Sequence, residues 1–319
     1  MVVTSGETCT DRIRREAFRL GFSHVGVARA EALDIEREGL EDWLARGYHA
    51  GMEWIARDPA RRADPRLVLE GARSVISVAM NYYHPVPHAT DPTVARISRY
   101  AWGDEYHDLM SGRLAALEEF IQQEKPDART RRVVDTAPVM DKAWAVRAGI
   151  GWLGKNAMVI TRDHGSWIFL GEILTTVALA YDTPIEDYCG TCTSCLDACP
   201  TQAIVAPAVV DSARCISYLT IEHRGEHPAA SREADFRNWI FGCDICQDVC
   251  PWNSFAQPSA EAAFAPRPEN LVIGIEEAAE IRDEEFRARF RKSPVKRAKP
   301  DGFRRNARTL LAQRESHTD

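Results

Sequence analysis

The spacing of apolar residues alternates between a helical and an extended period from the start of the chain. Apolar positions three or four residues apart predict helices over residues 7–20, 35–54, 105–124 and 138–148. Short apolar runs predict strands over residues 24–29, 73–80, 131–135, 157–161 and 166–174. The last two runs flank a turn at Asp163, His164 and Gly165, which predicts a β-hairpin and therefore a mixed sheet instead of a doubly wound parallel one. The pattern indicates an α+β protein.

The apolar period weakens after Tyr181, where turn residues and cysteines replace it until about Asn253. Beyond that point we expect regular structure to resume in a basic segment. We therefore predict three parts: a mixed α/β domain over residues 1–180, a cysteine-rich domain over 181–255, and a helical C-terminal segment over 256–319 that packs on the other two.

No stretch of the sequence is typical of a membrane helix or an export signal. The most apolar stretch, residues 166–181, contains Glu172 and is shorter than the roughly 18 uncharged residues that a spanning helix needs. Arg14 and Arg15 are not followed by the long apolar run of a signal peptide. We therefore expect a cytoplasmic protein without a membrane anchor.

Eight of the nine cysteines lie between Cys189 and Cys250, and only Cys9 lies outside this segment. A disulfide scaffold is not expected in a reducing cytoplasm, so the crowding indicates metal binding or catalysis. We expect Cys9 to be an ordinary surface thiol.

The cysteine spacing is typical of a protein with two 4Fe-4S clusters. A first run beginning at Cys189 reads C-x2-C-x2-C-x3-C-P, in which three close thiolates bind one cluster and the fourth binds the other. A second run ending at Cys250 repeats only the last three positions, and Cys215 is the nearby thiol that completes it. The crossed arrangement predicts two ligand sets: Cys189, Cys192, Cys195 and Cys250 for one cluster, and Cys199, Cys215, Cys243 and Cys246 for the other.

Two other interpretations of the cysteines account for less of the sequence. Structural zinc sites would use the C-x2-C pairs but have no use for the third cysteine of each run or for the Cys-Pro endings. A non-enzymatic electron carrier would need only the cysteine region, whereas about 180 residues precede it here. We therefore predict a redox enzyme whose reaction centre is built by the rest of the chain.

Two weaker motifs favour structural roles. Gly149, Gly151 and Gly154 spell G-x-G-x-x-G, but they follow a predicted helix and precede a strand, which is the reverse of the dinucleotide-binding context. We expect them to allow close approach of a neighbouring element or of a large flat ligand. His84 and His88 lie among prolines in a loop, where zinc binding is an alternative to the favoured solvated turn.

Asp135 ends a predicted strand in an apolar setting, and two roles remain open for it. It could cap the following helix. It could instead be a general acid whose pKa is raised by partial burial.

The charge of the chain is distributed unevenly. The net charge is −7, yet the segment from Arg287 to Arg308 contains ten Lys or Arg and only one acid, Asp301. Such a segment is suited to binding a polyanion, and the alternative is a solvated or self-paired charged face.

Taken together, these motifs resemble the epoxyqueuosine reductase family over nearly the whole chain. The resemblance is carried by the cysteine runs and by five further segments: SRYAWGDEYH (98–107), VDTAPVMDKAWAVRAGIGWLGKN (134–156), HGSWIFLGEIL (164–174), CISYLTIEHRG (215–225) and SPVKRAKPDGFRRNA (293–307).

The resemblance implies that residues 1–180 are a cobalamin-binding catalytic domain, followed by a ferredoxin-like domain with two 4Fe-4S clusters. The implied reaction reduces epoxyqueuosine to queuosine at the wobble position of tRNA, with Asp135 as the proton donor. The implied cobalamin contacts are Arg57, Ser98, Tyr100, Asp135, Val159, Leu170 and Ser217. The tRNA contacts expected in the basic segment are Lys296, Arg297, Arg304 and Arg305.

The same resemblance implies an external electron donor of the flavodoxin or ferredoxin type and a monomeric enzyme. A reductive dehalogenase-like cobalamin and iron-sulfur reductase is the alternative enzyme, and a non-enzymatic electron carrier is the alternative outside enzymes.

Overall fold

A four-stranded sheet with strand order β1-β2-β7-β4 lies at the centre of the N-terminal part of the chain. The computed structural model describes residues 7–232 and 234–316. All three strand pairs of this sheet are antiparallel. The strands of the described chain are β1 (His24–Arg29), β2 (Ser74–Asn81), β3 (Arg96–Ile97), β4 (Thr130–Val133), β5 (Trp152–Leu153), β6 (Val159–Ile160), β7 (Ile168–Thr175), β8 (Ile204–Ala206), β9 (Val209–Val210) and β10 (Trp239–Phe241).

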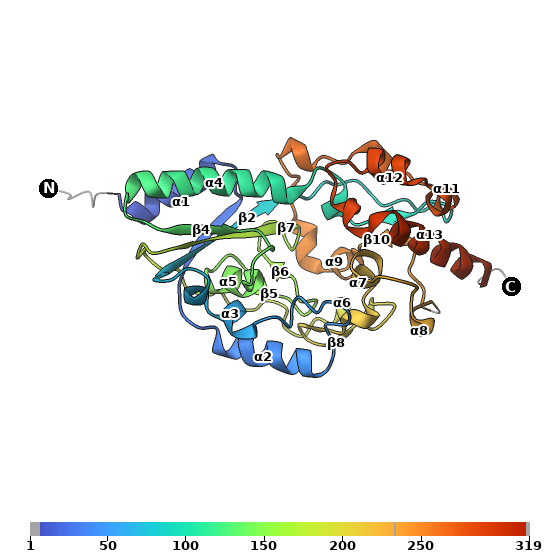
Figure 1. Ribbon diagram of the computed structural model, residues 1–319, viewed down its shortest axis with the longest axis horizontal. Coiled ribbons are helices and arrows are strands. Elements are labelled where there is room, and N and C mark those ends of the chain that lie inside the picture. The colour runs from blue at the N-terminus through green and yellow to red at the C-terminus, as the bar shows by residue number, and fades with distance from the viewer. Residues whose placement is uncertain (1–6, 233, 317–319) are drawn as a thin grey trace.

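Helices cover both faces of the sheet, with α1 and α4 on one side and α5 on the other (Figure 1). In the described ranges, no helix combines the length and the apolar character needed to cross a membrane. The α-helices are α1 (Cys9–Arg19), α2 (Asp34–Ala45), α3 (Pro59–Ala63), α4 (Tyr106–Glu124), α5 (Asp141–Arg147), α6 (Ser194–Asp197), α7 (Ile216–Ile221), α8 (Ala229–Arg232), α9 (Ile245–Asp248), α10 (Pro268–Leu271), α11 (Ile275–Glu280), α12 (Asp283–Arg289) and α13 (Lys299–Ser316).

The two central strands explain the continuous apolar runs in the sequence. Every residue of β2 is buried, because helices pack on both faces of the sheet. Ile76 of β2 pairs with Val27 on one side and with Ile173 on the other, and all three side chains are fully buried. The α+β class predicted from the pattern is confirmed.

The first helix forms where the apolar period predicts it. Thr8 and Asp11 make a reciprocal capping box, which satisfies two backbone N–H groups at the start of α1. Ile13 and Ala17, one turn apart, are fully buried against the sheet layer.

The predicted helix over residues 35–54 is too long, because α2 ends at Ala45. The backbone after Ala45 forms hydrogen bonds with the cysteine-rich part instead of continuing the helix. Ser212 donates its N–H to the Tyr48 carbonyl (2.9 Å), and the Gly51 N–H donates to the Tyr218 hydroxyl (2.8 Å).

The predicted hairpin, and with it the mixed sheet, is wrong. β6 pairs with β5, and only an isolated bridge joins Thr161 to Gly165. The next N–H group, that of Ser166, donates to the Asn253 side chain (2.7 Å). The backbone here is therefore hydrogen-bonded to the segment that follows Cys250.

A second apolar core joins distant parts of the sequence. β3 pairs in parallel with β10, and Trp102, Trp239 and Phe303 are buried in one cluster. Residues of all three predicted domains thus share this core. The predicted domain limits stay a prediction, and residues 1–6 and 317–319 lie outside the described chain.

The glycines of the G-x-G-x-x-G segment allow close backbone approach. Gly149 follows α5 with φ of +72°, and a Cβ there would lie 2.6 Å from the Thr183 carbonyl oxygen. A Cβ on Gly151 would lie 2.2 Å from the Ile160 carbonyl oxygen. The expected approach of a neighbouring element is confirmed.

Candidate functional site

A cavity of about 1710 Å³ lies where the sheet domain meets the cysteine-rich segment. Its lining includes the apolar side chains of Trp43, Val139, Val146, Leu153, Val209 and Ile216. Ordinary small-molecule sites have volumes of about 300–1,000 Å³, so this cavity is suited to a larger ligand.

The eight clustered cysteines fall into two groups of neighbours, and none of them forms a disulfide. Burial raises the pKa of the Cys195 thiol, and the nearby thiols of Cys250, Cys189 and Cys192 raise it further. Burial also raises the pKa of Cys215, to which Cys199 contributes. These neighbours agree with the two sets expected from spacing, and thiolate sets of this kind suit 4Fe-4S clusters.

Only the second set of cysteines borders the cavity. Its members are Cys199, Cys215, Cys243 and Cys246. Burial raises the pKa of the Cys246 thiol. Cys215 of the second set and Cys195 of the first set both raise this pKa further, so the two sets are adjacent. The arrangement provides a short path from the first set through the second to the cavity.

A buried amide positions the segments that carry Cys215 and Cys243. The Asn306 side chain of α13 donates to the carbonyl oxygens of Thr220 (2.8 Å) and Ile240 (2.9 Å). Thr220 lies in the last turn of the helix that begins after Cys215, and Ile240 lies in the strand that leads to Cys243.

The carboxylate of Asp244, next to Cys243, is fully buried and contacts three residues. It accepts hydrogen bonds from the Ser98 hydroxyl (2.5 Å) and from the backbone N–H of Arg99 (2.8 Å). His88 Nε2 lies 3.1 Å from the same carboxylate and 2.7 Å from the Arg99 guanidinium. The expected solvated turn at His88 is therefore wrong, because its ring packs against Trp102 and Trp239 and faces Asp244.

Asp135 lies at the cavity wall in a left-handed backbone conformation, with φ of +44°. It does not cap a helix, because α5 begins at Asp141 with Met140 as its N-cap. Its side chain is 52% exposed, which is more than the partial burial we expected. Its carboxylate accepts hydrogen bonds from the Tyr106 hydroxyl and from His107 Nε2 (3.0 Å).

His107 connects Asp135 to a buried acid. Burial disfavours the imidazolium, but hydrogen bonds to Asp135 and Glu105 raise the pKa of His107 to about 9. Burial would raise the pKa of Glu105, yet hydrogen bonds from His107 and Lys296 hold it below its usual value. The pair of His107 and Asp135 therefore holds a proton at neutral pH.

Sequence reasoning missed a buried carboxyl group behind the cavity. Burial raises the pKa of Glu172 well above its usual value, and Asp141 raises it further. Ser77 donates its hydroxyl to Glu172 (3.1 Å). The signal was an acid in the apolar run of β7, since a buried carboxyl there must be neutral or paired. Tyr106 and His107 lie in the quoted segment 98–107, but no pattern in the sequence linked them to Asp135.

Of the seven expected cobalamin contacts, Tyr100 and Asp135 line the cavity. The Ser98 hydroxyl donates its hydrogen bond to the buried carboxylate of Asp244. Arg57 is exposed, Val159 is buried, and Leu170 and Ser217 are half-buried, all outside the cavity lining. A cofactor contact at these positions stays a prediction.

The four expected tRNA contacts divide into two kinds. Lys296 and Arg297 lie at the cavity rim with side chains 57% and 56% exposed, and they pair with Glu105 and Glu222. Arg305 is only 8% exposed and donates to the carbonyl oxygens of residues 219, 223 and 225, so a phosphate contact there is contradicted.

Arg304 is also mostly covered and pairs with Asp283 and Asp301. Self-pairing, the alternative for the basic segment, thus holds for much of it. The sequence reasoning did not select Lys299, which is exposed at the cavity rim.

Comparison with known proteins identifies the family. Residues 62–136 match the family model described as "Epoxyqueuosine reductase QueG, DUF1730", and residues 188–253 match "4Fe-4S double cluster binding domain". An epoxyqueuosine reductase of Cellulophaga algicola is 46% identical over 94% of this chain and 97% of its own length. The chain belongs to the epoxyqueuosine reductase family. A Synechocystis epoxyqueuosine reductase is 48% identical over 87% of this chain and 96% of its own.

Solved epoxyqueuosine reductases share the fold. One, in complex with an epoxyqueuosine-modified tRNA-Tyr stem loop, has a TM-score of 0.88 and 34% identity over 95% of this chain and 80% of its own. Another, from Bacillus subtilis, has its catalytic aspartate loop swung out of the active site; its TM-score is 0.88, with 32% identity over 97% of this chain and 82% of its own.

Membership of the epoxyqueuosine reductase family decides between the interpretations of the cysteines. The matched double cluster domain contains all eight of them. The chain is therefore an oxidoreductase with two 4Fe-4S clusters, and the zinc and dehalogenase alternatives are not favoured.

We predict that Cys215→Ser disturbs only the cluster beside the cavity, because Cys215 lies with the second set of thiols. The variant should keep the cluster held by Cys189, Cys192, Cys195 and Cys250. Iron analysis and EPR of the reduced protein measure both clusters separately. Cys9→Ser, at the start of α1, is the control and should match the parent; full iron and an unchanged spectrum in Cys215→Ser would refute the assignment.

Proposed function

We propose that this chain reduces epoxyqueuosine to queuosine at the wobble position of tRNA, with cobalamin held in the cavity. One observation carries the proposal: the same cavity is bordered by the second cysteine set, by the proton-holding pair of Asp135 and His107, and by exposed Lys296 and Arg297. Electrons, a proton and a polyanion can thus meet in one place.

The residues at the cavity are suited to a large flat cofactor. The volume exceeds that of ordinary small-molecule sites, and the lining combines apolar side chains with Tyr100 on one wall. Such walls would hold the faces of a corrin ring and exclude water from it. When bound, the clusters and cobalamin supply the two electrons that the reaction consumes.

The protein supplies the proton that bond cleavage needs. Conversion of an epoxide to an alkene with loss of water takes up two electrons and two protons. The C–O bond would otherwise release an alkoxide, so a positioned acid contributes about 100-fold to 10,000-fold in rate. Asp135 faces the cavity, and His107 replenishes its proton through the 3.0 Å hydrogen bond.

The position of Asp135 in a loop is consistent with this role. Its backbone is left-handed, and its side chain is half exposed. The Bacillus subtilis relative is described with its catalytic aspartate loop swung out of the active site. We infer that Asp135 lies on the corresponding loop.

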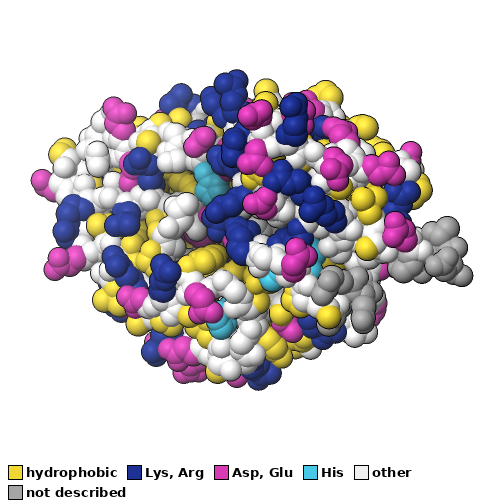
Figure 2. Space-filling view, turned by 45° about the vertical axis from the view of Figure 1, so that its right-hand side comes forward, with side chains coloured by type: hydrophobic (Ala, Val, Ile, Leu, Met, Phe, Trp, Pro, Cys, Tyr) yellow, Lys and Arg dark blue, Asp and Glu magenta, His cyan; other side chains and the backbone are white. Residues whose placement is uncertain are grey.

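The tRNA would approach the basic rim of the cavity. Figure 2 shows Lys and Arg side chains gathered near the middle of one face, beside exposed apolar surface. Lys296, Arg297 and Lys299 are the exposed cations of the rim from the basic segment. Phosphate contacts there would place the anticodon loop over the opening.

We also infer that an external donor of the flavodoxin or ferredoxin type reduces the first cluster. That cluster's ligands, Cys189, Cys192, Cys195 and Cys250, lie outside the cavity lining. A monomer acting in the cytoplasm remains our expectation.

We predict that Asp135→Asn loses the chemical step, because an amide keeps the shape but cannot donate an acidic proton. The single-turnover rate with pre-reduced enzyme and epoxyqueuosine-containing tRNA should fall about 100-fold to 10,000-fold. Iron content, cobalamin content and tRNA affinity should be retained. Asp127→Asn, an exposed acid in the turn after α4, is the control; a rate for Asp135→Asn within a few-fold of the parent would exclude the proton-donor role.

We predict that the single-turnover rate falls as pH rises through about 9, where His107 loses the proton it holds in the folded enzyme. Below that pH the imidazolium persists, so the rate should be flat on the acid side of this transition. His107→Gln keeps a polar side chain but carries no titratable proton. It should lower the rate at neutral pH and remove the transition near pH 9; an unchanged pH profile would contradict the pairing of His107 with Asp135.

We predict that the double variant Lys296→Gln/Arg297→Gln weakens tRNA binding and its salt dependence. The slope of log K against log salt concentration should flatten by about one unit per lost phosphate contact. Arg282→Gln/Arg287→Gln removes two exposed cations outside the cavity lining and is the matched control. Equal slopes in the parent and the rim variant would place the tRNA elsewhere.

A further inference from the structure

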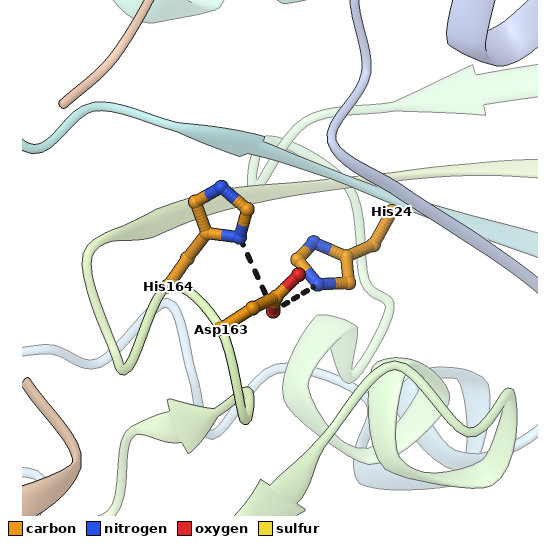
Figure 3. Close-up of side chains that lie close together, drawn as sticks. All are labelled: His24, Asp163 and His164. Atoms are coloured by element: carbon orange, nitrogen blue, oxygen red, sulfur yellow. Dashed lines mark hydrogen bonds and ion pairs between the residues drawn. The ribbon is translucent and has the colours of Figure 1, made fainter. Parts of the chain in front are cut away.

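Two histidines and an aspartate converge on one point away from the reaction cavity. His24 begins β1, and Asp163 and His164 lie in the turn between β6 and β7 (Figure 3). Asp163 Oδ1 lies 2.9 Å from His24 Nε2 and 3.2 Å from His164 Nδ1. The three donor atoms lie within 4.8 Å of one another, and none of these residues lines the cavity.

The surroundings of His24 allow its Nε2 to act as a ligand. Ser23 Oγ lies 3.0 Å from the Ala79 carbonyl oxygen, to which its hydroxyl donates, and 3.1 Å from His24 Nδ1. In the tautomer that carries the imidazole hydrogen on Nδ1, Ser23 Oγ accepts from the ring. Nε2 then presents a lone pair to Asp163 Oδ1, and a cation held by both atoms satisfies this contact.

Both imidazoles turn a ring nitrogen toward the Asp163 carboxylate. The two histidine side chains are mostly covered, at 17% exposed for His24 and 19% for His164. Nδ1 of His164 is buried and lies 3.2 Å from Asp163 Oδ1, without the geometry of a hydrogen bond. Both imidazoles thus have a ring nitrogen available as a ligand.

We propose that His24, Asp163 and His164 bind a divalent transition-metal ion, with Zn²⁺ as the expected occupant. Two imidazole nitrogens and one carboxylate oxygen are ligands that zinc accepts in tetrahedral sites. The contact between Ser23 and His24 Nδ1 is the kind of outer hydrogen bond that orients a metal-binding imidazole. The fourth position would take water, since the Asp163 side chain is 61% exposed.

The position of the site indicates a structural role. The turn that carries Asp163 and His164 is held on its far side by Asn253, which accepts from the Ser166 N–H (2.7 Å). Asn253 in turn donates its own N–H to the carbonyl oxygen of Cys250, a ligand expected for the first cluster. A bound ion would therefore tie β1 to the turn that supports this cluster segment.

The test uses anaerobic holoprotein with both clusters loaded, so that the cluster cysteines are not free to take zinc. After dialysis against buffered Zn²⁺, metal analysis should find one zinc per chain in addition to the iron. Asp163→Asn and His164→Gln should each weaken zinc binding at least about tenfold, with iron content unchanged. His223→Ala removes a histidine of a different loop, whose Nε2 donates to the Glu226 carbonyl oxygen (2.8 Å), and is the control that should bind zinc as the parent does.

The variants at the exposed turn carry the test, since His24 packs within the sheet and its replacement could disturb folding. Bound zinc should also raise the midpoint of thermal unfolding in the parent and not in His164→Gln. Absence of stoichiometric zinc, or equal zinc in the parent and both turn variants, would overturn the proposal. So would NMR titration showing that a proton alone occupies the gap between His24 and Asp163.

Discussion

The reaction cavity depends on the buried hydrogen bonds made by one helix, α13. Asn306 bonds to the backbone after Cys215 and to the backbone before Cys243, and thereby sets the relative positions of two cysteines of the cavity-side set. Arg305, beside it, donates to three further carbonyl oxygens of the α7 region. Losing a partner for such buried groups costs about 1–3 kcal/mol each, so these bonds hold one arrangement of the ligands. The basic segment thus has an inward face that builds the cluster site and an outward face suited to tRNA.

The same arrangement brings proton and electron chemistry to one cavity. Asp135 follows the end of β4 in the antiparallel sheet, and Tyr106 and His107 lie in the first turn of α4. A chain of contacts runs from the rim to the acid: Lys296 to Glu105, Glu105 to His107, and His107 to Asp135. Lys296, a cation exposed at the cavity rim, is therefore electrostatically linked to the pair that holds the proton.

Local pattern predicted the elements well where packing agreed with it. The helices α1 and α4 follow their apolar period, because each buries the face that the period defines, and β1 and β2 lie where short apolar runs predicted strands. The predictions failed where the backbone found partners far away in sequence. Residues 46–54 bond to the cysteine-rich part instead of extending α2, and Ser166 bonds to Asn253 instead of to β6. The spacing of apolar residues within a segment does not reveal hydrogen-bond partners that are distant in the sequence.

The sequence by itself determined the cluster chemistry, because the spacing of thiolates along a short segment limits which metal centre can form, and its motifs determined the family. Tertiary structure alone decided which charged residues are exposed at the cavity rim. Arg305 and Arg297 look equivalent in the sequence, yet one is buried against carbonyl oxygens and the other is exposed at the cavity rim. Likewise, only folding places His107 beside Asp135 and His24 beside Asp163. Burial and proximity set the protonation state and the reach of a side chain, and both arise from contacts between segments that are remote in the chain.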